Sequence, residues 1–202
     1  MQDSIKSPRS FALFALCAPL FVAVAACADA PPPPPAVPGA PNEKATAAEV
    51  LKAPGLKLVE VPLEAKSGSK LTGKASFSEV PGGVKVTVQV AGAPPGKIAT
   101  HVHEKGDCSA PDGASAGGHF NPKSKPHALP ANPERHLGDL GNIEVKPDGT
   151  GTTDIVIMGA NLKPGDANSF AGKAIIVHAK EDDGGQPTGN AGGRIGCGVI
   201  PQ

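Results

Sequence analysis

Residues 84–90 read Val-Lys-Val-Thr-Val-Gln-Val, and this strict alternation limits the possible folds more than any other feature of the chain. Side chains alternate between the two faces of a β-strand, so one face of this strand is apolar and the other is polar. Residues 71–77 alternate in the same way, and Pro81-Gly82-Gly83 between the two segments is a turn signal. The two segments are therefore predicted to form a β-hairpin with one buried face.

Further short strands are expected along the rest of the chain. Turn-forming residues such as Pro147-Asp148-Gly149 divide it, and it has 26 Gly, 23 Pro and no Trp or Tyr among 202 residues. This composition fits strands joined by turns better than a helix bundle. The predicted fold class is all-β, an antiparallel barrel or sandwich of about eight strands. Besides the hairpin, the candidate strands span residues 56–63, 98–103, 143–146, 152–158, 174–178 and 195–200.

Residues 104–142 interrupt this pattern. They have little apolar periodicity and are rich in Gly, Pro, His and Asp. A loop of this length inside a compact domain is usually functional. We therefore expect the chemistry of the domain to involve this loop.

The N-terminal segment has the features of an export signal. Two basic residues, Lys6 and Arg9, precede an apolar run at residues 11–26. The run is too short for a comfortable transmembrane helix and has the length of a signal-peptide core. It ends in Val24-Ala25-Ala26-Cys27, which resembles a bacterial lipobox, the motif at which a signal is cut before a cysteine that then carries lipid.

We therefore expect a lipoprotein-type signal peptide at residues 1–26, a Pro-rich linker at 27–55 that begins with a lipid-modified Cys27, and a folded domain at 56–202. The residue after Cys27 is Ala, which favours the outer membrane. The expected location is the bacterial cell envelope, on the periplasmic side, with membrane contact only through the lipid. The alternative is an ordinary signal peptide cut near Ala26 or Ala28. The balance of 19 basic and 19 acidic residues argues against a nucleic-acid partner.

Two of the four cysteines remain for the folded domain. Cys17 would leave with the signal and Cys27 would carry the lipid, so Cys108 and Cys197 are left in an exported, oxidising compartment. One structural disulfide is the favoured interpretation, because neither cysteine belongs to a Cys-x-x-Cys metal motif. Two free or metal-binding thiols are the alternative.

The six histidines are concentrated in and around the long loop, or end a strand. His101 and His103 are two residues apart on a predicted strand, so both imidazoles project from the same face with the spacing of a metal chelate. An all-imidazole set suits copper, whereas three imidazoles and one carboxylate suit tetrahedral Zn²⁺. A single histidine is more often a surface or core residue, so the prediction depends on the group. The second candidate set, on the loop, is His119, His127, His136 and Asp139.

Several separated motifs resemble those of the copper/zinc superoxide dismutases, in the same order, over most of residues 56–202. The resemblance implies a Greek-key β-barrel with a long metal-binding loop. The motifs are His101-Val102-His103-Glu104-Lys105-Gly106-Asp107-Cys108, Gly118-His119-Phe120-Asn121-Pro122, Arg135-His136-Leu137-Gly138-Asp139-Leu140-Gly141-Asn142, Val177-His178, and Gly189-Asn190-Ala191-Gly192-Gly193-Arg194-Ile195-Gly196-Cys197-Gly198.

The resemblance also implies the role of each site residue. Arg194 would lie beside the copper and attract the anionic substrate, or fix the loop by hydrogen bonds, and the two roles are compatible. Asp182 would accept hydrogen bonds from two of the ligands, His101 and His127, unless it is a solvated acid. The Cys108–Cys197 disulfide would fasten the loop close to Arg194. Copper would be held by His101, His103, His119 and His178, and zinc by His119, His127, His136 and Asp139.

The implied reaction is the dismutation of superoxide to dioxygen and hydrogen peroxide, with copper cycling between Cu(II) and Cu(I). His119 would bridge both metals as a deprotonated imidazole, take up a proton when its bond to copper opens, and pass it to the product. The implied zinc is structural. His119 and Arg194 are thus the expected catalytic residues.

Other functions and some details stay open. One alternative is a non-catalytic copper- or zinc-binding envelope module of the same fold, and another is a structural lipoprotein. Both a monomer and a homodimer fit the sequence. Residues 184–193 carry no charge, so substrate steering would need lysines elsewhere, with Lys105, Lys123 and Lys125 as candidates or merely solvated charges.

Overall fold

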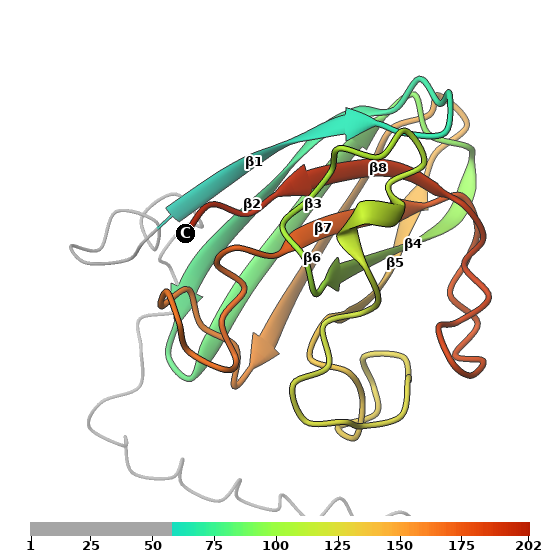
Figure 1. The fold of residues 1–202 in the computed structure, drawn as a ribbon. Helices are drawn as coiled ribbons and strands as arrows, with labels where there is room; N and C mark the ends of the chain where they lie inside the picture. The colour runs from blue at the N-terminus through green and yellow to red at the C-terminus, as the bar shows by residue number, and fades with distance from the viewer. Residues whose placement is uncertain (1–57) are drawn as a thin grey trace, which may run out of the picture. The chain divides into compact units, whose positions relative to one another are not determined.

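The computed structural model describes residues 58–202, in which eight strands close into one antiparallel barrel (Figure 1). The predicted all-β class is confirmed, and every predicted strand corresponds to an observed one. The expected signal peptide, the lipid-bearing Cys27 and the linker lie outside the described residues. The strands are β1 (Leu58–Ala65), β2 (Thr72–Val80), β3 (Gly83–Ala91), β4 (Gly96–His103), β5 (Asp139–Val145), β6 (Gly151–Met158), β7 (Ala174–His178) and β8 (Arg194–Val199).

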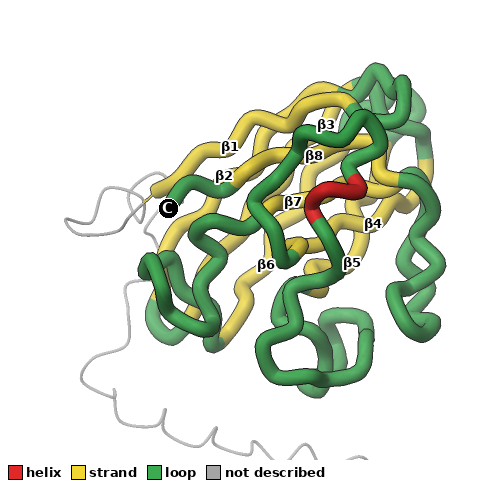
Figure 2. Tube along the Cα trace, viewed as in Figure 1, coloured by secondary structure: helices red, strands yellow, loops and turns green. Residues whose placement is uncertain are grey.

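The strand order around the barrel is β1-β2-β3-β6-β5-β4-β7-β8, and β8 pairs with β1. Strands β4, β5 and β6 are consecutive neighbours, and β7 returns to lie beside β4, which makes a Greek key. Figure 2 shows that the connections are loops apart from one short 3-10 helix, Ala114–Ala116. Within residues 58–202, no helix has the length and apolarity needed to cross a membrane.

The valines that predicted the fold fill the interior of the barrel. Val84, Val86 and Val88 of β3 are fully buried. The apolar face of β2 packs with them through Phe77, whose ring meets that of Phe170 edge to face, with centroids 6.2 Å apart. The alternation therefore did predict which face is buried.

Strands β4 and β7 are buried on both faces. Every residue from Ile98 to His103 is buried, although only alternate ones point into the barrel. The outer face is covered by the β4–β5 loop, residues 104–138, which passes over β7 and β8 in Figure 1. A second small apolar cluster seals this layer, formed by Cys108, Ala116, Ala174, Ile176 and Cys197. Side chains on the outer face of β4 are thus enclosed between sheet and loop.

Among the predicted strand boundaries, the start of β5 differs most from the structure. The strand expected at residues 143–146 begins earlier, at Asp139, because Asp139 pairs with His101 on β4. The segment Leu140-Gly141-Asn142 has no apolar alternation, so no periodic pattern marks this extension of the strand. Its consequence is functional, because it places the Asp139 carboxylate next to the histidines of β4.

Candidate metal centre

The structure brings all six histidines into one buried layer between the sheet and the β4–β5 loop. His101 and His103 come from the outer face of β4, and His178 ends the neighbouring strand β7. The strand pairing shifts beside two of these histidines, between Ala99 and His101 and again at His178. Such irregularities re-aim a side chain relative to a regular strand. The remaining three are supplied by the loop, as His119, His127 and His136.

Three imidazoles of the first group present a free nitrogen toward a common point. His101 Nε2 lies 2.9 Å from a carboxylate oxygen of Asp182, and His103 Nδ1 lies 2.9 Å from the carbonyl of Gly117. The Nδ1 atom of His178 lies 3.3 Å from the carbonyl of Gly192. Each of these N–H groups donates to an oxygen, so the opposite nitrogen carries a lone pair. Those nitrogens, His101 Nδ1, His103 Nε2 and His178 Nε2, are buried and have no hydrogen-bond partner among residues 58–202.

Burial keeps these imidazoles neutral, which is the form that binds a metal. Desolvation lowers the pKa of His103 to about 2 and that of His178 to about 3. It also lowers the pKa of His101, where the hydrogen bond to Asp182 acts in the opposite direction. Neutral imidazoles with unpaired, buried lone pairs fit a metal ion that completes them. These three nitrogens and a nitrogen of His119 all lie within 4.8 Å of one another.

The second group converges on the carboxylate of Asp139. Its Oδ1 lies 2.9 Å from His119 Nδ1 and 3.2 Å from His136 Nδ1, and its Oδ2 lies 3.0 Å from His127 Nδ1. Burial raises the pKa of Asp139, but the hydrogen bond with His119 and the charges of His127 and His136 outweigh it, so the pKa is lowered overall. The carboxylate is therefore ionised. Three imidazole nitrogens around one carboxylate form the closed donor set that Zn²⁺ prefers.

His119 belongs to both groups. Its Nδ1 lies with Asp139 and His136 in the second group, which leaves Nε2 for the first. Its ring centroid lies 4.1 Å from that of His101 and 5.4 Å from those of both His127 and His136. The main chain of His119 is fixed by an isolated β-bridge to His103. One imidazole is thus common to the two groups.

Asp182 links the two groups of histidines through the ring nitrogens that point away from the donor sets. Its Oδ2 lies 2.9 Å from His101 Nε2, and its Oδ1 lies 2.9 Å from His127 Nε2. The side chain is fully buried, so it is not a solvated acid. Burial raises the pKa of Asp182, yet the hydrogen bonds from His101 and His127 outweigh this and lower the pKa well below its usual range. An ionised carboxylate here fixes both rings with their Nδ1 atoms toward the two donor sets.

Arg194 is tied to the first group through a shared carbonyl. Its Nη1 donates to Gly113 O and its Nη2 donates to Gly117 O, both at 2.7 Å. Gly117 O also accepts the hydrogen bond from His103. The half-buried guanidinium is thus held by the β4–β5 loop, one carbonyl away from a histidine of the first group. The loop-fixing role is visible in these contacts.

Cys108 and Cys197 are joined by a disulfide, which confirms the favoured interpretation of the two cysteines. The bridge connects the β4–β5 loop to β8, its two cysteines are 89 positions apart in the sequence, and their Cα–Cα distance is 5.8 Å. It closes the small apolar cluster under the loop, three residues after Arg194 in the chain. It therefore fixes the loop at the point where the guanidinium of Arg194 is held.

Replacing Cys197 by Ser is expected to lower the free energy of unfolding by about 2–5 kcal/mol, because the bridge constrains a long loop of the unfolded chain. Thermal unfolding followed by circular dichroism, with and without reductant, measures the change. The double variant Cys108→Ser/Cys197→Ser is the control, since reductant should not affect it. Equal melting temperatures for oxidised and reduced wild-type protein would contradict the stabilising role.

Three further residues support the site and were not singled out from the sequence. The side-chain amide of Asn142 donates to the carbonyl of Asp182 at 2.9 Å and accepts from the N–H of Asp182 at 2.8 Å. Gln186 binds the main chain of His127 in the same way. Gly189 leaves room for the contact between the Asp182 carboxylate and His127, because a Cβ atom there would lie 2.1 Å from Asp182 Oδ1. A motif search could have found Gly189 and Asn142, which lie in the quoted motifs, whereas nothing in the sequence marks Gln186.

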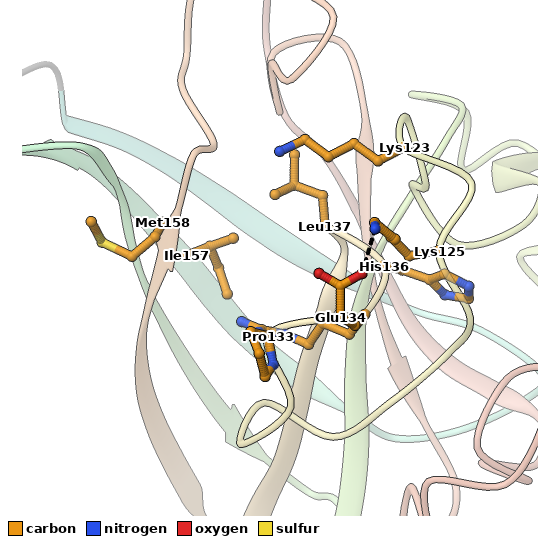
Figure 3. A pocket seen from close by; sticks show the side chains of 9 residues that line it. Lys123, Lys125, Pro133, Glu134, His136, Leu137, Ile157 and Met158 are labelled. Atoms are coloured by element: carbon orange, nitrogen blue, oxygen red, sulfur yellow. Dashed lines mark hydrogen bonds and ion pairs between the residues drawn. The ribbon is translucent and has the colours of Figure 1, made fainter.

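The candidate steering lysines lie in different surroundings. Lys125 forms an ion pair with Glu134, and both line a groove of about 340 Å³ with Lys123 and Met158 (Figure 3). Of the six histidines, only His136 borders this groove. Lys180 is a cation that the sequence analysis did not name, and its side chain packs on Gly192, whose carbonyl accepts a hydrogen bond from His178. Steering by Lys105, Lys123 or Lys125 stays a prediction.

Comparisons with known proteins agree with the geometry. Residues 71–200 match the model of the family described as copper/zinc superoxide dismutase (SODC). A curated relative, "Superoxide dismutase [Cu-Zn] 2" of Aquifex aeolicus (strain VF5), is 41% identical over 137 residues, which make up 65% of this chain and 80% of the relative. A crystal structure of the clock protein EA4 is similar with a TM-score of 0.63 and 37% identity, over 70% of this chain and 92% of that one.

Proposed function

This chain belongs to the copper/zinc superoxide dismutase family, and from that membership we propose how its two donor sets convert superoxide to dioxygen and hydrogen peroxide. It is an enzyme of the superoxide dismutase class that uses copper and zinc. The proposal concerns which residues hold each metal and what they do during the reaction. The observation that carries it is the single imidazole of His119 shared by the two donor sets.

The all-imidazole group would hold copper, and the group with Asp139 would hold zinc. Support comes from the donor chemistry, since copper prefers imidazole nitrogen and Zn²⁺ prefers a closed tetrahedral set. The unpaired nitrogens of His101, His103 and His178 also support it. The copper ligands are His101, His103, His119 and His178, and the zinc ligands are His119, His127, His136 and Asp139.

When bound, copper supplies one-electron redox chemistry, and zinc supplies a fixed charge that orders the loop. The overall reaction consumes two superoxide anions and two protons and yields one dioxygen and one hydrogen peroxide. The electron leaves the first superoxide, which becomes dioxygen, and reaches the second, which needs both protons to become peroxide. The remaining task of the protein is to attract an anion and to deliver a proton.

Arg194 and His119 would perform these two tasks. The guanidinium of Arg194 is a permanent cation with paired N–H donors, which suits a small anion next to the copper ligands. The Nε2 atom of His119 would carry a proton in one half of the reaction and donate it to the product. His119 Nδ1 stays engaged with the Asp139 group throughout. The ring then keeps its position while the proton arrives and leaves.

The proposed location is the bacterial cell envelope, on the periplasmic side and anchored by lipid on Cys27. The apolar run at residues 11–26 and the lipobox-like Val24-Ala25-Ala26-Cys27 support this. The mass of the mature N-terminal peptide, measured by mass spectrometry, tests it. A peptide that starts at Cys27 with added acyl mass is expected, and an unmodified cysteine would overturn the anchor.

Metal analysis combined with a superoxide assay tests the function. The purified chain is expected to bind about one copper and one zinc and to catalyse dismutation that cyanide or a copper chelator abolishes. Protein concentration must come from amino-acid analysis, because the chain has no Trp or Tyr to absorb at 280 nm. Full metal loading without dismutation would overturn the catalytic proposal and favour a metal-binding module of the same fold.

The metal-free protein is expected to lose stability as the pH falls below about 6.5, the ordinary pKa of histidine. Burial lowers the pKa of His103 to about 2 and of His178 to about 3, so below pH 6.5 the unfolded chain binds protons that the folded chain does not. Each such histidine reduces the free energy of unfolding by up to about 1.4 kcal/mol per pH unit. The loss continues down to pH values near those lowered pKa values.

Chemical denaturation in the presence of a chelator, at pH 7, 6, 5 and 4, measures this slope. In the matched variant His178→Gln one titrating group is missing, and the slope should be smaller by up to about 1.4 kcal/mol per pH unit. A free energy of unfolding that stays constant between pH 7 and 4 would show that these histidines are not buried in the neutral form.

A further inference from the structure

A lysine is buried beside the disulfide, in the turn between β1 and β2. Lys66 is only 9% exposed, and its Nζ lies 2.5 Å from the carbonyl oxygen of Cys108 and 3.3 Å from a carboxylate oxygen of Glu64. A buried ammonium group costs free energy unless it is paired and hydrogen-bonded. Both partners are present here, one from the β4–β5 loop and one from β1. This lysine thus joins two parts of the chain with its charge.

Main-chain N–H groups and serine hydroxyls of the same turn bind both sides of the Arg194 site. Ser67 N donates to the carbonyl of Pro111 at 2.8 Å, and Ser67 Oγ donates to the carbonyl of Arg194, also at 2.8 Å. Lys66 N and Ser69 Oγ both donate to the carbonyl of Ile195, the next residue of β8. The turn therefore contacts the loop on one side and the beginning of β8 on the other.

The loop segment that Lys66 contacts, residues 108–113, is also the segment that holds the guanidinium of Arg194. Gly113 O accepts a hydrogen bond from Arg194 Nη1, and the side chain of Arg194 lies 3.4 Å from the position that a Cβ of Gly113 would take. The aliphatic part of Lys66 packs on the same point, at 3.7 Å. A shift of residues 108–113 away from Lys66 would move one of the two carbonyls that aim the guanidinium.

We propose that Lys66 is a positioning residue for Arg194, holding the loop carbonyls in place through Cys108 in parallel with the Cys108–Cys197 disulfide. This inference rests on the proposed function of Arg194 as the group that binds the anionic substrate. Among residues 58–202, no hydrogen bond joins Lys66 to a histidine, so its action passes through the loop. Cys108 is thus held in two independent ways, by the covalent disulfide and by the charge-assisted hydrogen bond from Lys66, so either can partly replace the other.

The test compares three changes at Lys66 with a control in the same turn. Lys66→Met keeps the length of the side chain and removes the charge and the donors. Lys66→Arg keeps a cation with donors, and Lys66→Gln keeps a donor without charge as a milder second variant. Lys70→Met removes one positive charge from an exposed lysine of the same turn and is the matched control.

The probes are azide, a small anion titrated spectroscopically against the metal-loaded full chain, and proteolysis of the loop in the metal-free chain. A charge-assisted hydrogen bond contributes enough that Lys66→Met should weaken azide binding and slow dismutation by about three- to tenfold. Lys66→Gln should give a smaller loss, and Lys66→Arg should recover most of the affinity. Lys70→Met should stay within about 1.5-fold of wild type, since an exposed charge has a small screened effect.

The parallel role predicts a coupling with the disulfide. Loop cleavage should increase moderately in Lys66→Met and in Cys108→Ser/Cys197→Ser, and by more than the product of the two effects when they are combined. Azide binding and loop cleavage in Lys66→Met and Lys66→Gln that equal those of Lys70→Met would overturn the inference. Wild-type protein that binds both metals but does not dismute superoxide would instead overturn the proposed function, because loop cleavage reports on Lys66 without metal.

Discussion

Replacing His119 by Ala is expected to abolish superoxide dismutation and to weaken the binding of both metals. His119 is the only residue that the two four-residue donor sets have in common, so a single truncation leaves each set with three donors. Loss of a partner outside the ligand set already reduces metal affinity or activity by about 10- to 100-fold, and loss of a ligand is expected to exceed this. The proposed carrier of the proton, His119 Nε2, is lost as well. Metal content after dialysis and the dismutation rate per chain measure the effect.

Two single-site variants provide the control. His103→Ala removes a ligand from the first set alone, and His136→Ala removes one from the second set alone. Each should lower the content of one metal and leave the other within a few-fold of wild type. Retention of activity in His119→Ala, or loss of a single metal there, would contradict the shared imidazole.

The barrel was predictable because its interior is a repeating pattern. The valines at 84, 86 and 88 face inward at every second position, so burial could be inferred without knowledge of the neighbours. The outer face of β4 could not be inferred in this way. His101 and His103 alternate with core residues as a solvent-facing row would, and they are buried only because the loop folds back over them.

The histidines and the aspartate of the candidate metal centre were predictable from their side-chain types. The main-chain contacts and the lysine that hold the surrounding loop in place were not. The side-chain chemistry and spacing of histidine and aspartate indicate candidate metal ligands in a sequence. The carbonyl of Gly117, in contrast, is a main-chain atom that any residue could supply. Lys66 contacts a loop 42 residues further along the chain, and exposed lysines are so common that a buried one has no signature in the sequence. The resemblance carried Arg194 and Asp182, and the contacts explain why these two residues are aimed as they are.

Replacing Asp182 by Asn is expected to weaken copper binding by about 10- to 100-fold while zinc binding changes much less. The carboxylate accepts two N–H groups, from His101 at Oδ2 and from His127 at Oδ1. An amide has only one acceptor oxygen, and its NH₂ group must face one of the two rings. The ring that meets the NH₂ group has to present a lone pair at Nε2. Its proton then moves to Nδ1, the atom needed for the metal.

The position of the amide is decided by a third contact. Asp182 Oδ1 also accepts a hydrogen bond from the main-chain N–H of Gly184 at 2.9 Å, so the oxygen of Asn is retained on that side. The NH₂ group therefore faces His101, and the copper set loses its ligand nitrogen to a proton. Asp182→Ala, which removes both acceptors, should weaken both metals. Metal titrations of the two variants separate these outcomes.

Asp183→Asn is the matched control for this change. Asp183 is the next residue, is exposed, and binds the main chain of Gly185 and the side chain of Asn190. The same change of charge at this position should leave both metal affinities within about twofold of wild type, because exposed charges are screened. Equal effects of Asp182→Asn and Asp183→Asn would mean that net charge matters and the tautomers do not. A selective loss of copper would show that the buried carboxylate of Asp182 sets the position of the proton on His101, and through it the affinity of the first donor set for its metal.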